Sequence, residues 1–70
     1  MRTQAERVGK RIKDLREAKG WTQVLLAFKV DTYQPWLSRI EAGQVMPTTS
    51  QSMRLARVFR ITLDELLEGK

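Results

Sequence analysis

The 70-residue chain has no cysteine and no histidine. The first absence excludes disulfides and thiolate metal sites, and the second removes the commonest general base and the commonest zinc ligand. The remaining carboxylates and hydroxyls are scattered, without the paired spacing that suggests acid–base catalysis. We therefore expect a protein that is not an enzyme and that uses neither a metal nor a cofactor.

Long apolar runs are also missing from the chain. No segment approaches the roughly 20 apolar residues of a membrane span, and no signal-peptide core is visible. We therefore expect a cytoplasmic protein without membrane contact. Seventy residues without an interdomain linker predict a single domain, residues 1–70. Because a single domain leaves no second domain to regulate it, we expect the activity of the protein to be controlled by its concentration, by dimerisation or by a separate partner.

Basic side chains are in excess. The chain carries 13 lysines and arginines against 8 acidic residues, a net charge of +5, and most of the excess lies in residues 1–20. A basic surface suits a polyanionic partner such as nucleic acid, but it also keeps a small domain soluble. Charge alone does not decide between these two interpretations.

The apolar residues recur at helical spacing, punctuated by glycine, proline and short polar turns, and no segment has the pattern of a strand. This predicts an all-α fold of five short helices. Thr-x-x-Glu patterns at Thr3 and Thr62 predict capping boxes for the first and fifth helices, and Thr22 is the expected N-cap of the second. The expected helices span about 4–19, 23–30, 34–42 and 49–59, with a fifth that opens at Thr62.

The third expected helix has an outer face suited to a groove in DNA. At about 100° per residue, Leu37 and Ile40 lie on its core side. Arginine can donate two hydrogen bonds to a guanine edge, and glutamine can pair with adenine. Any short amphipathic helix also presents a polar outer face, so both interpretations stay open. The outer face consists of Pro35, Ser38, Arg39 and Ala42, with Gln34 at its edge.

Two helices of about eight residues joined by a short turn, at about 22–42, match the geometry of a helix-turn-helix. The run TQVLLAFKVDTYQPWLSRIEAGQVMP, with IKDLREAKGW before it and LARVFRITLDELL after it, resembles the Xre-like family of small Cro- and phage-repressor-like helix-turn-helix proteins. The resemblance covers about residues 8–67. It implies a compact five-helix, repressor-like DNA-binding domain.

The resemblance also implies roles for individual residues. Gln23 matches the family glutamine that contacts phosphate and braces the reading helix, and Arg39 and Gln34 are expected to supply most base readout. Arg16 and Glu41 match a family pair that joins the first helix to the third. Glu41 lies on the core side of its helix, where a carboxylate needs a partner, although Arg16 could also be an ordinary surface arginine. The expected DNA-binding residues are Thr22, Gln23, Tyr33, Gln34, Pro35, Ser38, Arg39 and Gln44.

Several positions depart from the family pattern. Asp31 and Arg60 stand where glycine is usual, and aspartate tolerates a positive φ better than most residues. Tyr33 replaces a small capping residue, which puts the cap of the third helix in doubt. Thr49 and Ser52 replace typical core aliphatic residues, so we expect a thinner core.

The second helix carries apolar residues on the side opposite its core-facing residues, where the family usually has charges. In one interpretation, which we favour, Phe28 and Trp36 fold back over a small core. In the other, these apolar side chains form a docking patch for another protein or subunit. The residues of this possible patch are Val24, Leu25, Phe28 and Trp36.

The sequence thus predicts a sequence-specific regulator of transcription that binds double-stranded DNA as a homodimer on a palindromic operator. The alternative is a protein-interaction module, such as an antitoxin or anti-regulator, that uses the Val24, Leu25 and Phe28 surface. In relatives the C-terminal helix region often makes the dimer contact. The corresponding candidates here are Met53, Val58, Ile61, Leu63 and Leu67.

Overall fold

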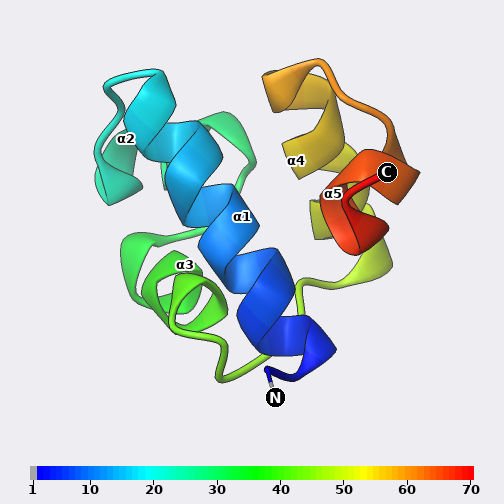
Figure 1. Ribbon diagram of the computed structural model, residues 1–70. Coiled ribbons are helices and arrows are strands. Elements are labelled where there is room, and N and C mark those ends of the chain that lie inside the picture. Colours follow the sequence, from blue (N-terminus) through cyan, green and yellow to red (C-terminus); the bar gives the residue numbers. More distant parts are fainter. Residues whose placement is uncertain (1) are drawn as a thin grey trace.

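The computed structural model describes residues 2–70 as five helices joined by short connections (Figure 1). In Figure 1, α1 crosses the front, α2 and α3 lie on one side of it, and α4 and α5 lie on the other. The all-α prediction is confirmed, and each predicted boundary lies within one residue of the observed one. No helix among these residues has the length and apolarity needed to cross a bilayer. The helices are α1 (Gln4–Ala18), α2 (Gln23–Lys29), α3 (Gln34–Glu41), α4 (Thr49–Phe59) and α5 (Leu63–Glu68).

The helix starts are fixed by threonine side chains that accept hydrogen bonds from backbone N–H groups. The predicted capping boxes at Thr3 and Thr62 and the predicted cap at Thr22 are all present. A third box, in which Thr48 pairs with Gln51 at the start of α4, was not predicted. Its Thr-x-x-Gln pattern carries the same signal with glutamine in place of glutamate.

The core lies between α1 and the other four helices. The predicted core residues Leu37 and Ile40 of α3 are fully buried, as are Val8 and Ile12 of α1. Ser52 is buried where the family has an aliphatic side chain, whereas Thr49 is exposed, so the expectation of a core position was wrong for Thr49. Thr49 is the first residue of α4, where its side chain points to solvent. The buried aliphatic and aromatic residues that form the core are Val8, Ile12, Leu26, Ala27, Val30, Leu37, Ile40, Leu55, Ala56, Phe59 and Leu66.

Gly9 allows α1 and α3 to approach each other closely. A Cβ atom at this position would overlap the carbonyl oxygen of Ile40 and would lie 3.0 Å from that of Glu41. Any side chain would therefore push the two helices apart. The sequence signal was present as a lone glycine within an amphipathic helix, but its reason is visible only in the packing.

Two of the departures from the family pattern adopt the backbone conformation that glycine usually supplies. Asp31 has φ 59° in the turn after α2, and Arg60 has φ 57° after α4. Asp31 also lies 3.5 Å from Arg54 of α4. Tyr33, the N-cap residue of α3, makes no capping hydrogen bond with its side chain. The turns therefore survive without glycine, and α3 begins without a side-chain cap.

Candidate nucleic-acid interface

The turn between α2 and α3 holds α3 with one face outward. Tyr33 is extended, with φ −122° and ψ 156°, and Pro35 occupies the first turn of α3, where its missing N–H has no intrahelical partner to lose. Leu37 and Ile40 anchor the opposite face in the core. Along the outward face Pro35, Arg39 and Ala42 are exposed and Ser38 is half-buried.

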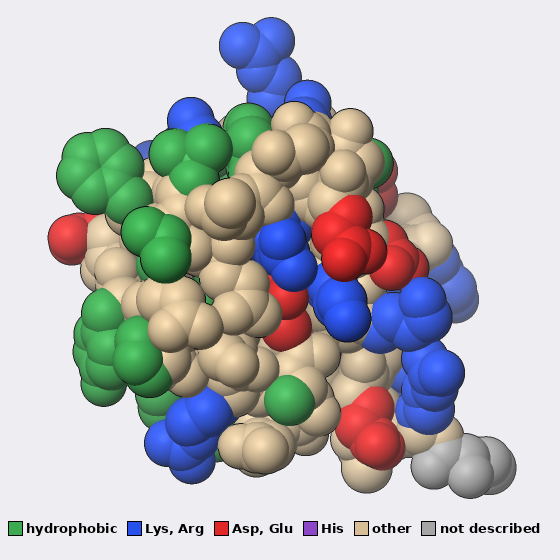
Figure 2. All heavy atoms as spheres, turned by 90° about the vertical axis from the view of Figure 1, so that its left-hand side faces the viewer, with side chains coloured by type: hydrophobic (Ala, Val, Ile, Leu, Met, Phe, Trp, Pro, Cys, Tyr) green, Lys and Arg blue, Asp and Glu red, His purple; other side chains and the backbone are tan. Residues whose placement is uncertain are grey.

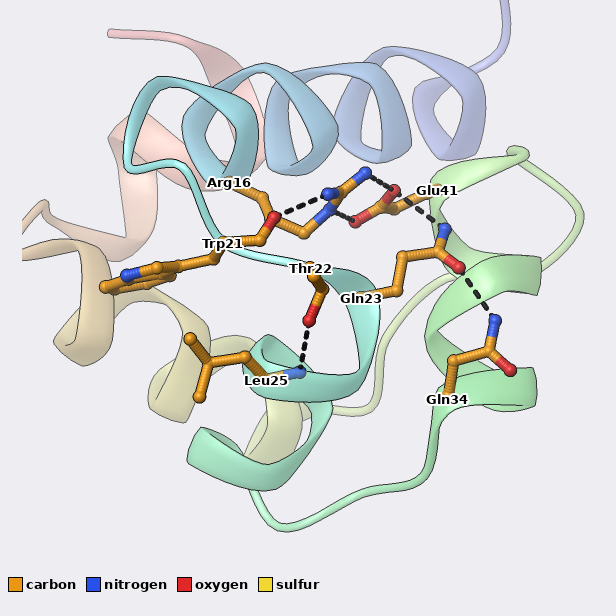
Figure 3. Close-up of polar contacts among 7 residues, drawn as sticks. All are labelled: Arg16, Trp21, Thr22, Gln23, Leu25, Gln34 and Glu41. Atoms are coloured by element: carbon orange, nitrogen blue, oxygen red, sulfur yellow. Dashed lines mark hydrogen bonds and ion pairs between the residues drawn. The ribbon is translucent and has the colours of Figure 1, made fainter.

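An ion pair behind this face ties α1 to the end of α3. Arg16 donates from Nε to Oε2 of Glu41 at 2.8 Å and from Nη2 to Oε1 at 3.0 Å (Figure 3). Its remaining Nη1 donates to the backbone oxygen of Trp21 at 2.7 Å. The hydrogen bond to Glu41 raises the pKa of Arg16, against the opposing effect of burial. Arg16 is buried, so the interpretation as a surface arginine is wrong.

Hydrogen bonds run from this ion pair to the tip of α3. Gln23 donates from Nε2 to Oε1 of Glu41 at 3.0 Å, and Gln34 donates from Nε2 to Oε1 of Gln23 at 2.8 Å (Figure 3). A carboxylate paired with an arginine only accepts, so Gln23 must turn its NH2 group toward Glu41. Its oxygen is then left to face Gln34, which must in turn supply an N–H. Glu41 thereby fixes the orientation of both amides.

The amide of Gln34 ends this chain at the surface. Its oxygen points away from Gln23 in Figure 3, and no hydrogen bond within residues 2–70 uses that oxygen. One acceptor and the second N–H of the NH2 group therefore remain for a ligand. An acceptor beside a donor is the arrangement that matches the N6 and N7 atoms of adenine.

The other candidate DNA-binding residues lie along α3, at its two ends and at the start of α2. Arg39 is exposed, with its guanidinium carbon 5.4 Å from the ring centroid of Trp36. Tyr33 is 66% exposed, and Gln44 is exposed just beyond the end of α3. Thr22 is exposed, but its hydroxyl already accepts from the N–H of Leu25, so it lies at this surface mainly as a cap. The contact between Trp36 and Arg39 was not predicted, although residues three apart on a helix are neighbours.

An exposed apolar patch, defined by Val24, Leu25 and Phe28, covers the outside of α2. Phe28 is 81% exposed and Val24 is 65% exposed. The favoured expectation that Phe28 folds over the core is therefore wrong, because α2 already fills its core side with other residues and no helix within residues 2–70 covers its outer side. Trp36 does pack against the core. In Figure 2 hydrophobic side chains gather on the left of the view, and Lys and Arg lie mostly on the right, with others at the top and the lower left.

The basic residues of α1 are partly engaged in holding the fold. Arg16 is buried in its ion pair, and Arg11 donates to the backbone oxygen of Leu66, which fastens α5 to α1. Lys10 pairs with Asp14 at 3.0 Å on the surface. Counting basic residues along the chain therefore overstates the positive charge that is available to a partner. In the part of the chain that the structure describes, acidic side chains form no cluster that could hold a metal ion.

Comparison with known proteins agrees with this geometry. The helix-turn-helix family model HTH_3 matches residues 12–66. The restriction-modification controller protein C.AhdI from Aeromonas hydrophila is 31% identical, with a TM-score of 0.81 over 89% of this chain and 90% of that one. The P22 c2 repressor, solved with a synthetic operator, has the same fold at 24% identity, with a TM-score of 0.85 over 90% and 96% of the two chains.

A search of curated proteins gave no match. The matched range nonetheless includes the whole of α2, α3 and the turn between them, and it extends into α5. The chain therefore belongs to the Xre-like helix-turn-helix family, the Cro/C1-type family of DNA-binding regulators of transcription.

Proposed function

We propose that this protein is a sequence-specific regulator of transcription that binds duplex DNA as a homodimer on a palindromic operator. The observation that carries the proposal is the Gln34 amide, which is held at the exposed tip of α3 in one orientation by Gln23 and Glu41. A side chain whose donor and acceptor positions are set before binding can distinguish one base edge from another at little ordering cost.

In the proposed complex α3 lies in the major groove. The Gln34 oxygen accepts from N6 of an adenine while its second N–H donates to N7, and Arg39 donates to O6 and N7 of a guanine. The small side chains of Pro35 and Ser38 let the helix approach the bases. Contacts of this kind discriminate against a wrong base by about 1–3 kcal/mol each.

Residues beside α3 are proposed to hold the DNA backbone. Tyr33 and Gln44 flank α3 in the chain and Gln23 opens α2, and polar groups at such positions can bind phosphate oxygens and set the register of the protein on the duplex. Thr22 contributes by fixing the start of α2. Basic side chains add affinity for DNA that decreases as the salt concentration rises, because phosphate binding releases counterions.

The C-terminal half offers a surface for the homodimer. Met53 is 48% exposed and Leu63 is 36% exposed. Both line a shallow hollow of about 290 Å³ together with Ala56, Arg57 and Ile61. Val58, Ile61 and Leu67 pack partly against the core and leave less surface for a partner. The domain measures 29 × 23 × 23 Å, which suits two copies reading half-sites about 34 Å apart.

Selection of bound sequences from random duplex DNA, at a stated salt concentration, tests the proposal. The protein should enrich a palindrome with an adenine and a guanine at fixed positions in each half-site. Arg39→Ala should lose the preference for the guanine while the variant remains folded. Absence of any enriched sequence would contradict the proposed function.

A second candidate function is favoured by the apolar patch of Val24, Leu25 and Phe28. Isolated apolar side chains on a surface need no explanation, but three on one short helix, two of them more than half exposed, form a surface that a protein partner could cover. In that case the chain captures another protein through α2, as an antitoxin or anti-regulator does, and DNA binding is secondary.

A further inference from the structure

We infer that Trp36 is a positioning residue for DNA recognition: its indole ring holds the guanidinium of Arg39 in place for reading a base. The inference rests on the proposed function, because it assigns Arg39 to base readout. Trp36 itself need not touch the DNA. It acts through Arg39.

The two residues lie one helical turn apart on α3. Positions three apart are neighbours on a helix surface. The guanidinium carbon of Arg39 lies 5.4 Å from the centroid of the Trp36 ring, within the range at which a cation is attracted to the face of an aromatic ring. Arg39 is otherwise exposed and has neither an ion-pair partner nor a side-chain hydrogen bond in the described part of the chain.

The ring is itself held firmly. Trp36 is half-buried and packs against the core, and its indole N–H is buried without a hydrogen-bond partner among the described residues. Phenylalanine would fill much of the same space without burying that unpaired donor, so core packing alone gives no reason for an indole here. The contact of the ring with Arg39 supplies a reason. Tryptophan is the best of the aromatic residues at binding a cation.

A fixed ring changes what Arg39 can do. A free arginine on a helix surface samples many rotamers, and ordering it on binding costs free energy. An arginine attracted to a rigid ring has already lost part of that freedom. Its N–H groups are then presented near one place in the groove. The expected consequence is sharper discrimination at the single base pair that Arg39 reads.

A double-mutant cycle tests this arrangement. The probe is the duplex most enriched by the unaltered protein, and the variants are Trp36→Leu, Arg39→Ala and the combination of both. Trp36→Leu should weaken binding by about 2- to 30-fold, the range of a cation–π contact, and should have less than about a 2-fold effect when Arg39 is already alanine. Trp36→Phe keeps an aromatic ring, so its affinity for the probe duplex should lie between those of the unaltered protein and Trp36→Leu. Thermal unfolding confirms that each variant is folded at the temperature of the binding measurement.

Two readouts separate positioning from a merely structural role. Repeating the selection with Trp36→Leu should relax the preference at the base pair that Arg39→Ala also relaxes, and leave the other positions unchanged. By NMR without DNA, the indole ring current should shift the Arg39 side-chain protons upfield in the unaltered protein, and Trp36→Leu should abolish the shift.

If Trp36→Leu lowers duplex affinity equally with Arg39 present and with Arg39 replaced by alanine, the inference is overturned. Trp36 would then act through the fold or touch DNA itself. Tighter binding by Trp36→Leu would also overturn it, since the ring would then be restraining Arg39 away from DNA. Unshifted Arg39 protons in the unaltered protein would overturn it without touching the proposed function. Failure of the unaltered protein to enrich any duplex would overturn both.

Discussion

The carboxylate of Glu41 and the guanidinium of Arg16 meet in a two-pronged contact, 2.8 and 3.0 Å long, at the boundary between α1 and α3. Both residues are buried, so each is the main compensation for the other's lost hydration. The same carboxylate sets the direction of the Gln23 and Gln34 hydrogen bonds. One ion pair therefore supports both the fold and the surface that is proposed to read DNA.

Glu41→Gln should be strongly destabilising because it leaves the Arg16 charge buried without a counter-charge. We expect the free energy of unfolding to fall by about 3–5 kcal/mol, measured by urea denaturation. Lys10→Met is the matched control, because it removes an exposed ion pair and should change stability by less than about 0.5 kcal/mol. If Glu41→Gln and Lys10→Met lowered the free energy of unfolding by similar amounts, the buried ion pair would contribute no more than an exposed one, which would contradict the prediction.

Gln23→Ala should alter recognition at a base that Gln23 is not proposed to contact. Without the Gln23 oxygen as partner, the Gln34 amide can turn over and present either its oxygen or its NH2 group. Selection from random duplexes should therefore show relaxed preference at the same base pair that Gln34→Ala relaxes, by about 1–3 kcal/mol of discrimination. A uniform loss of affinity for all sequences would show instead that Gln23 only binds phosphate.

Gly9→Ala should destabilise the protein, although alanine is the better helix former by about 1 kcal/mol. The added Cβ would overlap the Ile40 backbone oxygen, and we expect a net loss of about 1–3 kcal/mol in urea denaturation. Helix propensity alone would make Gly9→Ala raise the free energy of unfolding, whereas the close approach of α1 and α3 makes it fall, so the sign of the change distinguishes the two effects. Ala18→Gly at the exposed end of α1 is the control, because it should lose only the propensity term. An increase in stability for Gly9→Ala would contradict the observed packing.

The difference between what was predictable and what was not follows from the range of each interaction. Caps such as Thr3 depend on residues three positions apart and could be predicted from the sequence, and the stripe that buries Leu37 follows from helical periodicity. Gly9 depends on a backbone more than thirty residues away, so its role could not be foreseen.

The outer side of α2 illustrates the same limit. Periodicity shows that Phe28 lies on the side of α2 opposite its core-facing residues, but it does not show whether another element covers that side. The prediction that Phe28 folds back over the core was therefore wrong. Arg16 and Glu41 lie 25 positions apart, and their partnership was suggested by family resemblance and by the need of a buried carboxylate for a partner. The Trp36–Arg39 contact has the three-residue spacing of helical neighbours, but it was overlooked because Trp36 was assigned either to the core or to the apolar patch.

The capping box of α1 predicts a specific response to acid. The backbone N–H of Thr3, which donates to the Glu6 carboxylate, is the main cause that lowers the pKa of Glu6 below its ordinary value of 4.5, and the Thr3 hydroxyl adds to it. A carboxyl with a lowered pKa in the folded state adds stability above its unfolded pKa and loses it as pH falls through the folded value. Melting temperatures measured from neutral pH downward should thus fall less steeply in acid for Glu6→Gln than for the unaltered protein.

The Thr3→Ala background provides the control for that experiment. Because the backbone and hydroxyl groups of Thr3 form the box together with Glu6, loss of the hydroxyl should weaken the effect of Glu6→Gln. The same acid response in both backgrounds would mean that the Thr3 hydroxyl is not its source and that the backbone N–H of residue 3 alone lowers the pKa of Glu6.

Phe28→Glu distinguishes the two proposed functions. The substitution places a charge in the middle of the apolar patch without removing a core contact, since Phe28 is 81% exposed, so stability should change by less than about 0.5 kcal/mol. If the protein acts through DNA, the variant should keep the sequence preference in selection, whereas Arg39→Ala should lose part of it. Affinity for any duplex should drop only modestly, because the added negative charge repels phosphates at a distance and is screened by salt. If activity in cells instead disappears with Phe28→Glu and survives Arg39→Ala, the working surface is α2, and the protein acts by capturing a partner.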